Sequence, residues 1–147
     1  MKQAAIEGVL LTPLKQIPNE KGDLMHAMKK SDAGFSGFGE AYFSTVHKGV
    51  IKAWKKHRKM VLNLTVPVGC IRFVIKDLRH DSKTFGSTMV VALGPNNYQR
   101  LTVPNNLWFG FEGVGEGLNL LLNIADMEHD PTEVERAALE QFDYPAI

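Results

Sequence analysis

The sequence has a single cysteine, almost no excess of one charge and no long apolar run, and each shortage excludes a class of protein. One cysteine, Cys70, excludes an intrachain disulfide and a cysteine-based zinc site. Seventeen Lys and Arg against sixteen Asp and Glu leave a net charge of +1, so no overall field recruits nucleic acid or acidic membranes. No segment approaches the roughly 18 apolar residues of a membrane span. We therefore expect neither nucleic acid nor membrane as a partner.

The composition is that of an ordinary folded protein. Of the 147 residues, 44% are hydrophobic and 22% are charged, which predicts one globular domain over residues 1–147. Glu7 interrupts an N-terminal apolar stretch that is too short for a signal peptide. Together with the lone cysteine, which fits a reducing compartment, this indicates a cytoplasmic protein.

Short segments of strand character, separated by turn residues, fill most of the chain. In the clearest, residues 69–78, Ile71, Phe73 and Ile75 alternate with other side chains, and the same register places Asp77 on the buried side. Many short, evenly spaced strands predict an all-β sandwich or jelly roll. The other expected strands cover residues 8–14, 40–46, 50–54, 60–66, 87–93, 99–103, 107–111 and 117–125.

One segment near the C-terminus has helix signals. Asp130 is a favourable N-cap, Pro131 suits the first helical position, and Glu133 follows the cap by three residues. These features predict a short C-terminal helix that ends at about Gln141.

The densest chemical feature is a basic run at residues 52–59, with six basic or titratable side chains in eight positions. Side chains two apart on a strand share a face, so Lys55, His57 and Lys59 are expected to converge on one concave surface. Such a cluster suits a phosphate-bearing ligand. The alternative is a solvated strand end. Trp108 either forms a stacking wall for a base or sugar or belongs to the core.

Five blocks of the chain lie at residues 49–60, 74–79, 81–86, 102–104 and 110–111. In their order and spacing they resemble the dTDP-4-dehydrorhamnose 3,5-epimerase family of the cupin superfamily. The resemblance covers residues 8–136 and implies a cupin-type β jelly roll. It also implies a homodimer with exchanged N-terminal strands and a barrel-mouth site for a nucleoside-diphosphate 4-keto sugar.

The resemblance also implies roles for single residues. Lys59 matches a lysine suited to stabilising an enolate, and Asp77 matches an aspartate that orients a histidine. Lys52 takes the place of an arginine that contacts the ligand. Lys21 stands where an arginine of the neighbouring subunit reaches the phosphates. The remaining substrate-binding positions are assigned to Tyr42, Trp108 and Asn123.

Four further positions depart from the family pattern, and at one of them His26 takes the place of a ligand-binding glutamate. Lys55 replaces the catalytic histidine, Phe109 replaces a second active-site histidine, and Asn123 falls where the acid tyrosine is expected. The base is therefore either Lys55, with a lowered pKa, or His57 two residues on. The five histidines are scattered, and the same replacements remove most candidate ligands of the cupin metal site, so we expect no metal and no cofactor.

The leading interpretation is a sugar-nucleotide epimerase or isomerase of polysaccharide or deoxysugar biosynthesis. It would act by abstracting a proton α to a ketone, which needs a base, an acid on the opposite face and a cation near the developing enolate. The alternative is a non-catalytic sugar-nucleotide-binding cupin that has lost the catalytic His and Tyr.

Overall fold

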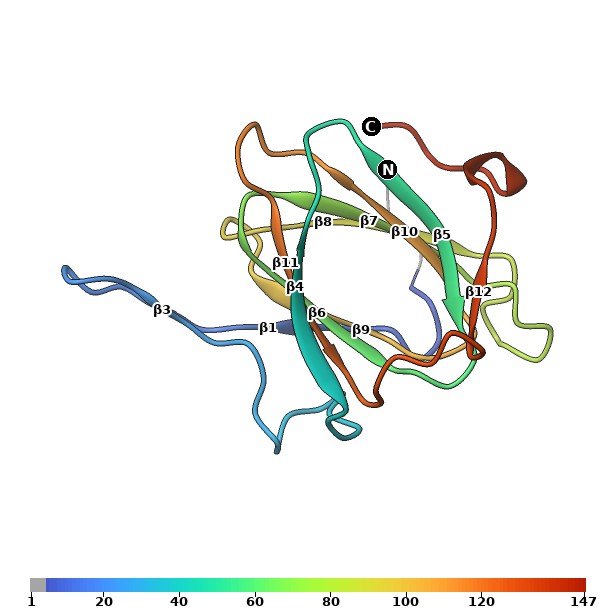
Figure 1. Ribbon diagram of the computed structural model, residues 1–147, viewed down its shortest axis with the longest axis horizontal. Coiled ribbons are helices and arrows are strands. Elements are labelled where there is room, and N and C mark those ends of the chain that lie inside the picture. The colour runs from blue at the N-terminus through green and yellow to red at the C-terminus, as the bar shows by residue number, and fades with distance from the viewer. Residues whose placement is uncertain (1–4) are drawn as a thin grey trace.

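The computed structural model describes residues 5–147 and consists of two five-stranded antiparallel sheets and one hairpin (Figure 1). One sheet has the order β1 (Leu10–Pro13), β9 (Gln99–Val103), β6 (Leu62–Val68), β11 (Leu120–Ala125) and β4 (Glu40–Thr45). The other has the order β12 (Val134–Arg136), β5 (Ile51–His57), β10 (Trp108–Gly113), β7 (Ile71–Lys76) and β8 (Thr88–Leu93). The prediction of an all-β fold is confirmed.

The core lies between the two sheets. Alternate side chains of β6 and β7 point inward, and Leu62, Leu64, Ile71, Phe73 and Ile75 are each no more than 1% exposed. The three side chains expected on the inner face of β7 thus belong to the core, but its other face is buried as well, because Val74 is 0% exposed and Arg72 is 7% exposed. Burial of each apolar side chain stabilises the fold by about 1.5–3 kcal/mol, so this layer holds the sheets together.

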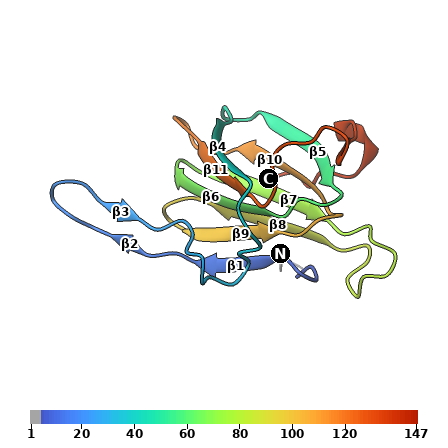
Figure 2. The same cartoon turned by 60° about the horizontal axis from the view of Figure 1, so that its bottom comes forward.

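A hairpin of β2 (Gln16–Ile17) and β3 (Leu24–Met25) extends away from both sheets (Figure 2). Ile17 is 47% exposed and Leu24 is 54% exposed, although both side chains are apolar. A lone two-stranded hairpin is at best marginally stable in water.

The prediction of a C-terminal helix is wrong. Asp130 does accept a hydrogen bond from the amide of Thr132 at 2.9 Å, but the chain then runs on as β12, and only a single 3-10 turn, Leu139–Gln141, follows. Strand β12 pairs with β5, which would otherwise be an edge strand with unpaired backbone groups. Satisfying that edge outweighs the local helix signals.

Within residues 5–147, no helix is both long and apolar enough to cross a membrane. The prediction that the N-terminal stretch is not a signal peptide includes residues 1–4, which lie outside the described residues.

Candidate active site

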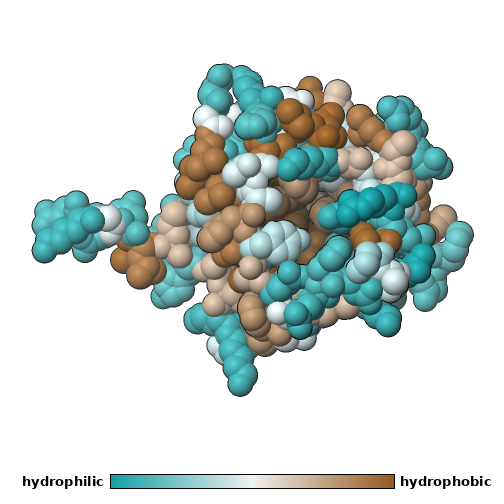
Figure 3. All heavy atoms as spheres, viewed as in Figure 1, coloured by the Kyte–Doolittle hydropathy of each residue, from teal (hydrophilic) through white to brown (hydrophobic). Residues whose placement is uncertain are grey.

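A cavity of about 450 Å³ opens between the two sheets, and the space-filling view shows the hollow (Figure 3). Its volume falls in the range typical of small-molecule sites. One wall comes from β5, β10 and the chain around β12, and the other from β4, β6 and β11. The polar and charged lining side chains are Tyr42, Ser44, Lys52, Lys55, His57, Asn123 and Arg136.

A bulge in β5 shapes the first wall. The register against β10 shifts so that Lys55 faces Phe109 while Lys52 faces Phe111, which leaves two residues of β5 opposite Gly110. Residues three apart on a regular strand point to opposite faces, but the extra residue lets both lysines line the cavity. A Cβ atom at Gly110 would lie 2.4 Å from the Cβ of Ala53, so this close approach of the strands requires glycine.

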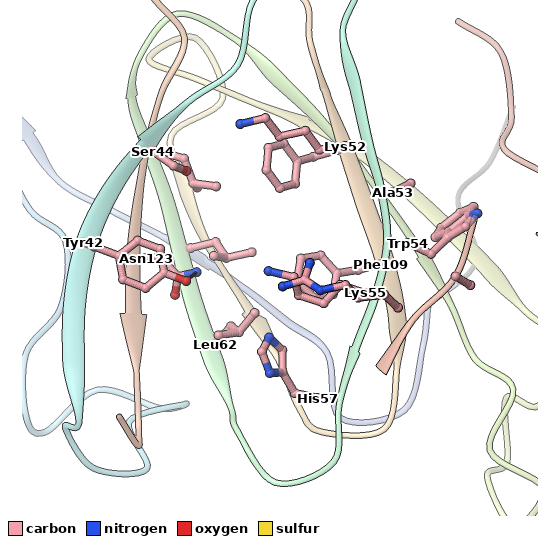
Figure 4. Close-up of a pocket in the computed structure, with 15 residues that line it drawn as sticks. Tyr42, Ser44, Lys52, Ala53, Trp54, Lys55, His57, Leu62, Phe109 and Asn123 are labelled. Atoms are coloured by element: carbon pink, nitrogen blue, oxygen red, sulfur yellow. Dashed lines mark hydrogen bonds between the residues drawn. The ribbon is translucent and has the colours of Figure 1, made fainter. Parts of the chain in front are cut away.

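His57 lies at one end of the cavity (Figure 4). Its imidazole is hydrogen-bonded to Glu133. The Nδ1 atom of His57 contacts Oε1 of Glu133, while Oε2 of the same carboxylate accepts from the amides of Lys59 and Met60 at 3.2 Å each. Both side chains are buried. A carboxylate fixed by three donors holds the proton of His57 on Nδ1, which leaves Nε2 free to accept a proton.

The surroundings keep His57 neutral. Burial lowers the pKa of His57 below its usual value, and the positive charges of Lys55 and Arg136 lower it too, although Glu133 acts in the opposite direction. Burial also opposes ionisation of Glu133, but the hydrogen bonds it accepts outweigh that effect and lower its pKa. The pair is therefore a neutral imidazole beside a carboxylate, which is the state that a general base needs.

Three cations line the cavity, and among residues 5–147 no carboxylate lines it. Arg136 of β12 stands directly opposite Lys55 of β5. Burial, and then the repulsion of Arg136, lower the pKa of the Lys55 amine. Lys52 reaches across to donate to the carbonyl of Thr45 at 2.8 Å. This surplus of positive charge favours an anionic ligand.

The opposite wall carries Tyr42 of β4 and Asn123 of β11. The amide nitrogen Nδ2 of Asn123 donates to the phenol oxygen of Tyr42 at 2.9 Å. Burial raises the pKa of Tyr42, and the charge of Glu40 raises it further. The phenol therefore keeps its proton at neutral pH.

Two predicted catalytic residues lie outside this arrangement. Strand β5 ends at His57, so Lys59 falls in the following turn, where its exposed side chain is not part of the cavity lining. Asp77 is fully buried and accepts hydrogen bonds from Arg79 at 2.9 Å and from Ser82 and Thr84 at 2.6 Å each. Those donors lower the pKa of Asp77 and anchor the loop after β7, so Asp77 orients no histidine.

Two predicted ligand-binding residues also lie elsewhere in the chain. Trp108 stands opposite Lys56 on the outer face of the sheet and packs against Phe142, because alternation turns Phe109 rather than Trp108 inward. Lys21 lies in the turn at the tip of the β2–β3 hairpin, far from the cavity of its own chain (Figure 1). In contrast, the structure brings Tyr42, Lys52, Lys55, His57 and Asn123 to the lining of one cavity.

Sequence reasoning missed Glu133 and Arg136. The sequence pattern assigns Glu133 to a helix cap and Arg136 to the helix that follows it. The only local signal for a strand was three residues, Val134–Arg136, which is too short to read by alternation. In the described part of the chain, no group of three His, Cys, Asp or Glu side chains is placed to hold a metal ion.

Comparison with known proteins places this geometry in a family. The family model for dTDP-4-dehydrorhamnose 3,5-epimerase matches residues 3–140. The chain belongs to this family. Among curated relatives, the spore coat polysaccharide biosynthesis protein SpsL of Bacillus subtilis is 30% identical over 128 residues, which cover 87% of this chain and 85% of that protein. The probable low-salt glycan biosynthesis epimerase Agl13 of Haloferax volcanii is 33% identical over 84 residues, 56% of this chain and 54% of that protein.

Solved structures agree with this membership in the epimerase family. A dTDP sugar isomerase from Desulfovibrio desulfuricans superposes with a TM-score of 0.89 at 42% identity, covering 92% of this chain and 87% of that one. A double mutant of ChmJ, a 3'-monoepimerase from Streptomyces bikiniensis in complex with dTDP, gives a TM-score of 0.84 at 14% identity and covers 99% and 78% of the two chains. The latter likeness shows the jelly-roll fold alone. The predicted family, and with it the sugar-nucleotide epimerase class, is confirmed.

We expect the buried His57 to make the stability of the protein pH-dependent. Because the pKa of His57 is lower in the folded state, the unfolded chain binds more protons as the pH falls below about 6.5. The free energy of unfolding should therefore decrease between pH 7.5 and 5.5. His57→Asn keeps a donor for Glu133 but does not titrate, so urea unfolding of this variant should show a smaller decrease. The exposed His129→Asn serves as the control and should follow the parent protein. Equal decreases in the parent protein and His57→Asn would contradict this electrostatic account.

Proposed function

We propose that the protein epimerises or isomerises a nucleoside-diphosphate 4-keto sugar by removing a proton α to the ketone, with His57 as the base. The observation that carries this proposal is the buried His57–Glu133 pair, whose free nitrogen borders a cation-rich cavity. The relatives support the substrate class, because solved members of the fold hold dTDP or dTDP sugars.

The reaction starts at the Nε2 atom of His57. This nitrogen takes the proton, the C–H electron pair becomes a C=C bond, and the carbonyl π pair moves onto oxygen to form an enolate. Glu133 stabilises the resulting imidazolium, as a carboxylate that orients a histidine base does. Return of a proton to the opposite face of the carbon re-forms the ketone and inverts the centre.

The enolate oxygen needs a cation, and Lys55 and Arg136 are placed to supply it. They face each other across β5 and β12 beside His57, so both reach the same part of the cavity. They replace Lys59 in this role, since Lys59 lies outside the cavity. Lys52, at the other end of the β5 bulge, is placed to bind the diphosphate. A charge-assisted hydrogen bond of this kind contributes about 1.5–3 kcal/mol to binding.

The central experiment is incubation with dTDP-4-keto-6-deoxyglucose in deuterated water. We expect the parent protein to incorporate deuterium at C3 or C5, because enolisation exchanges the α proton with solvent. His57→Asn should slow this exchange by at least about a hundredfold, as loss of a general base does. His129→Asn, an exposed histidine outside the cavity, should exchange like the parent protein.

The alternative function, a sugar-nucleotide-binding protein without catalysis, predicts a different result. The absence of the family's histidine at Lys55 and of its tyrosine at Asn123 favours that alternative. It predicts that dTDP raises the melting temperature while the parent protein exchanges no deuterium with this sugar or its CDP, GDP and UDP counterparts.

We further propose a homodimer in which the β2–β3 hairpin packs on the neighbouring subunit and brings Lys21 to its phosphate site. The hairpin extends from its own chain and exposes Ile17 and Leu24, which supports a partner surface.

Light scattering should give twice the 16.4 kDa of one chain for the parent protein. The double variant Ile17→Ser, Leu24→Ser should give a monomer. Leu118→Ser removes an equally exposed leucine, 54%, and should remain dimeric. A double variant that stays dimeric would contradict the proposed role of the hairpin.

A further inference from the structure

The wall opposite His57 carries a tyrosine in an unexpected position. Asn123 of β11 stands where the acid tyrosine of the family is expected, but Tyr42 stands directly opposite it on the neighbouring strand β4. Directly opposed residues of an antiparallel pair have side chains on the same face of the sheet. Both line the cavity, so a phenol lies beside the position from which the expected one is missing.

The direction of the hydrogen bond between them leaves the phenol proton free. Because Nδ2 of Asn123 donates to the oxygen of Tyr42, the oxygen acts as an acceptor in this bond. The O–H of Tyr42 is not used in the bond to Asn123 and can be donated to a ligand. The same amide would stabilise a phenolate once the proton has left.

A second observation also points to a ligand on this wall. Asn123 is only 7% exposed, and within residues 5–147 its buried Oδ1 atom has no hydrogen-bond partner. An unpaired buried acceptor destabilises the empty site, because the atom has lost its hydrogen bonds to water. If the Asn123 amide turns toward the cavity, a hydroxyl of a bound sugar can donate to this atom, and the ring then lies against Tyr42.

The two walls place the phenol and the imidazole on opposite sides of the cavity. Figure 4 shows Tyr42 and Asn123 on one wall and Lys55 and His57 on the other, with open space between them. Tyr42 is 42% exposed, so its phenol meets the open cavity rather than the core. A sugar ring between the walls presents one face to each of them.

We propose that Tyr42 is the general acid of the reaction, positioned by Asn123, and that it protonates the carbon on the face opposite His57. This assignment rests on the proposed function. The phenol O–H bond breaks, a C–H bond forms from the C=C pair of the enolate, and the carbonyl is restored. The phenolate then takes a proton from water and the His57 imidazolium releases one, so the enzyme returns to its starting state.

Removing the acid should separate exchange from inversion. In Tyr42→Phe, His57 still removes the α proton and returns a solvent deuteron to the same face. With dTDP-4-keto-6-deoxyglucose in deuterated water, we expect deuterium in sugar of unchanged configuration at a rate within tenfold of parent exchange. Formation of the inverted sugar should fall by at least about a hundredfold. Tyr98→Phe removes a phenol that donates to the carbonyl of His26 outside the cavity, and this control should invert the sugar like the parent protein.

Two results would overturn the assignment. One is inversion by Tyr42→Phe within about threefold of the parent rate. The other is an equal loss of exchange and inversion in a Tyr42→Phe protein that still binds dTDP and unfolds at the parent temperature. A parent protein that exchanges no deuterium would instead overturn the proposed function on which the assignment rests.

Discussion

The site depends on the pairing of β12 with the edge of β5. Three consecutive residue pairs join these strands, and the first and the last of them shape the site. The pair that begins at His57 brings Glu133, one residue before β12, against the imidazole. The last pair sets Arg136 opposite Lys55. Without this short strand, β5 would have an open edge, His57 would have no carboxylate, and the cavity would lose one of its three cations.

The two faces of the β5–β12 pair differ in how their charges are matched. On the outer face, Lys56 and Glu135 form an ion pair at 3.0 Å. On the inner face, Lys55 and Arg136 are like charges directly opposite each other, an arrangement that destabilises a sheet. Repulsion of this kind in the empty cavity is relieved when negative charge develops between the two groups. A cation pair therefore binds an enolate better than a neutral ketone, which is the difference that accelerates a reaction.

The sequence predicted those parts of the site that lie on single strands. Alternation located β7, and spacing by two placed Lys55 and His57 together on one face. The same rule failed for Lys59, because it assumes that the strand continues and β5 ends at His57. Spacing also could not show that Lys52 joins this face, since that depends on a bulge opposite Gly110.

The remaining features arise from contacts between distant segments. Glu133 is 76 residues from its histidine, and the helix signals around Asp130 are equally compatible with the turn that is found. Tyr42 could be suspected as an acid only once β4 was known to lie beside β11. Local patterns carry no information about which edge a short strand will cover, so these pairings required the three-dimensional structure.

In the ligand-free protein, His57 is a neutral base held by Glu133, and its imidazole can be observed directly. Nitrogen-15 NMR of the histidine-labelled protein without ligand distinguishes the two tautomers and the protonated ring. At pH 7 the His57 ring should be neutral and carry its proton on Nδ1, and it should become protonated only below about pH 6.5. A His57 ring that is protonated on both nitrogens at pH 7, or neutral with its proton on Nε2, would contradict this assignment of His57.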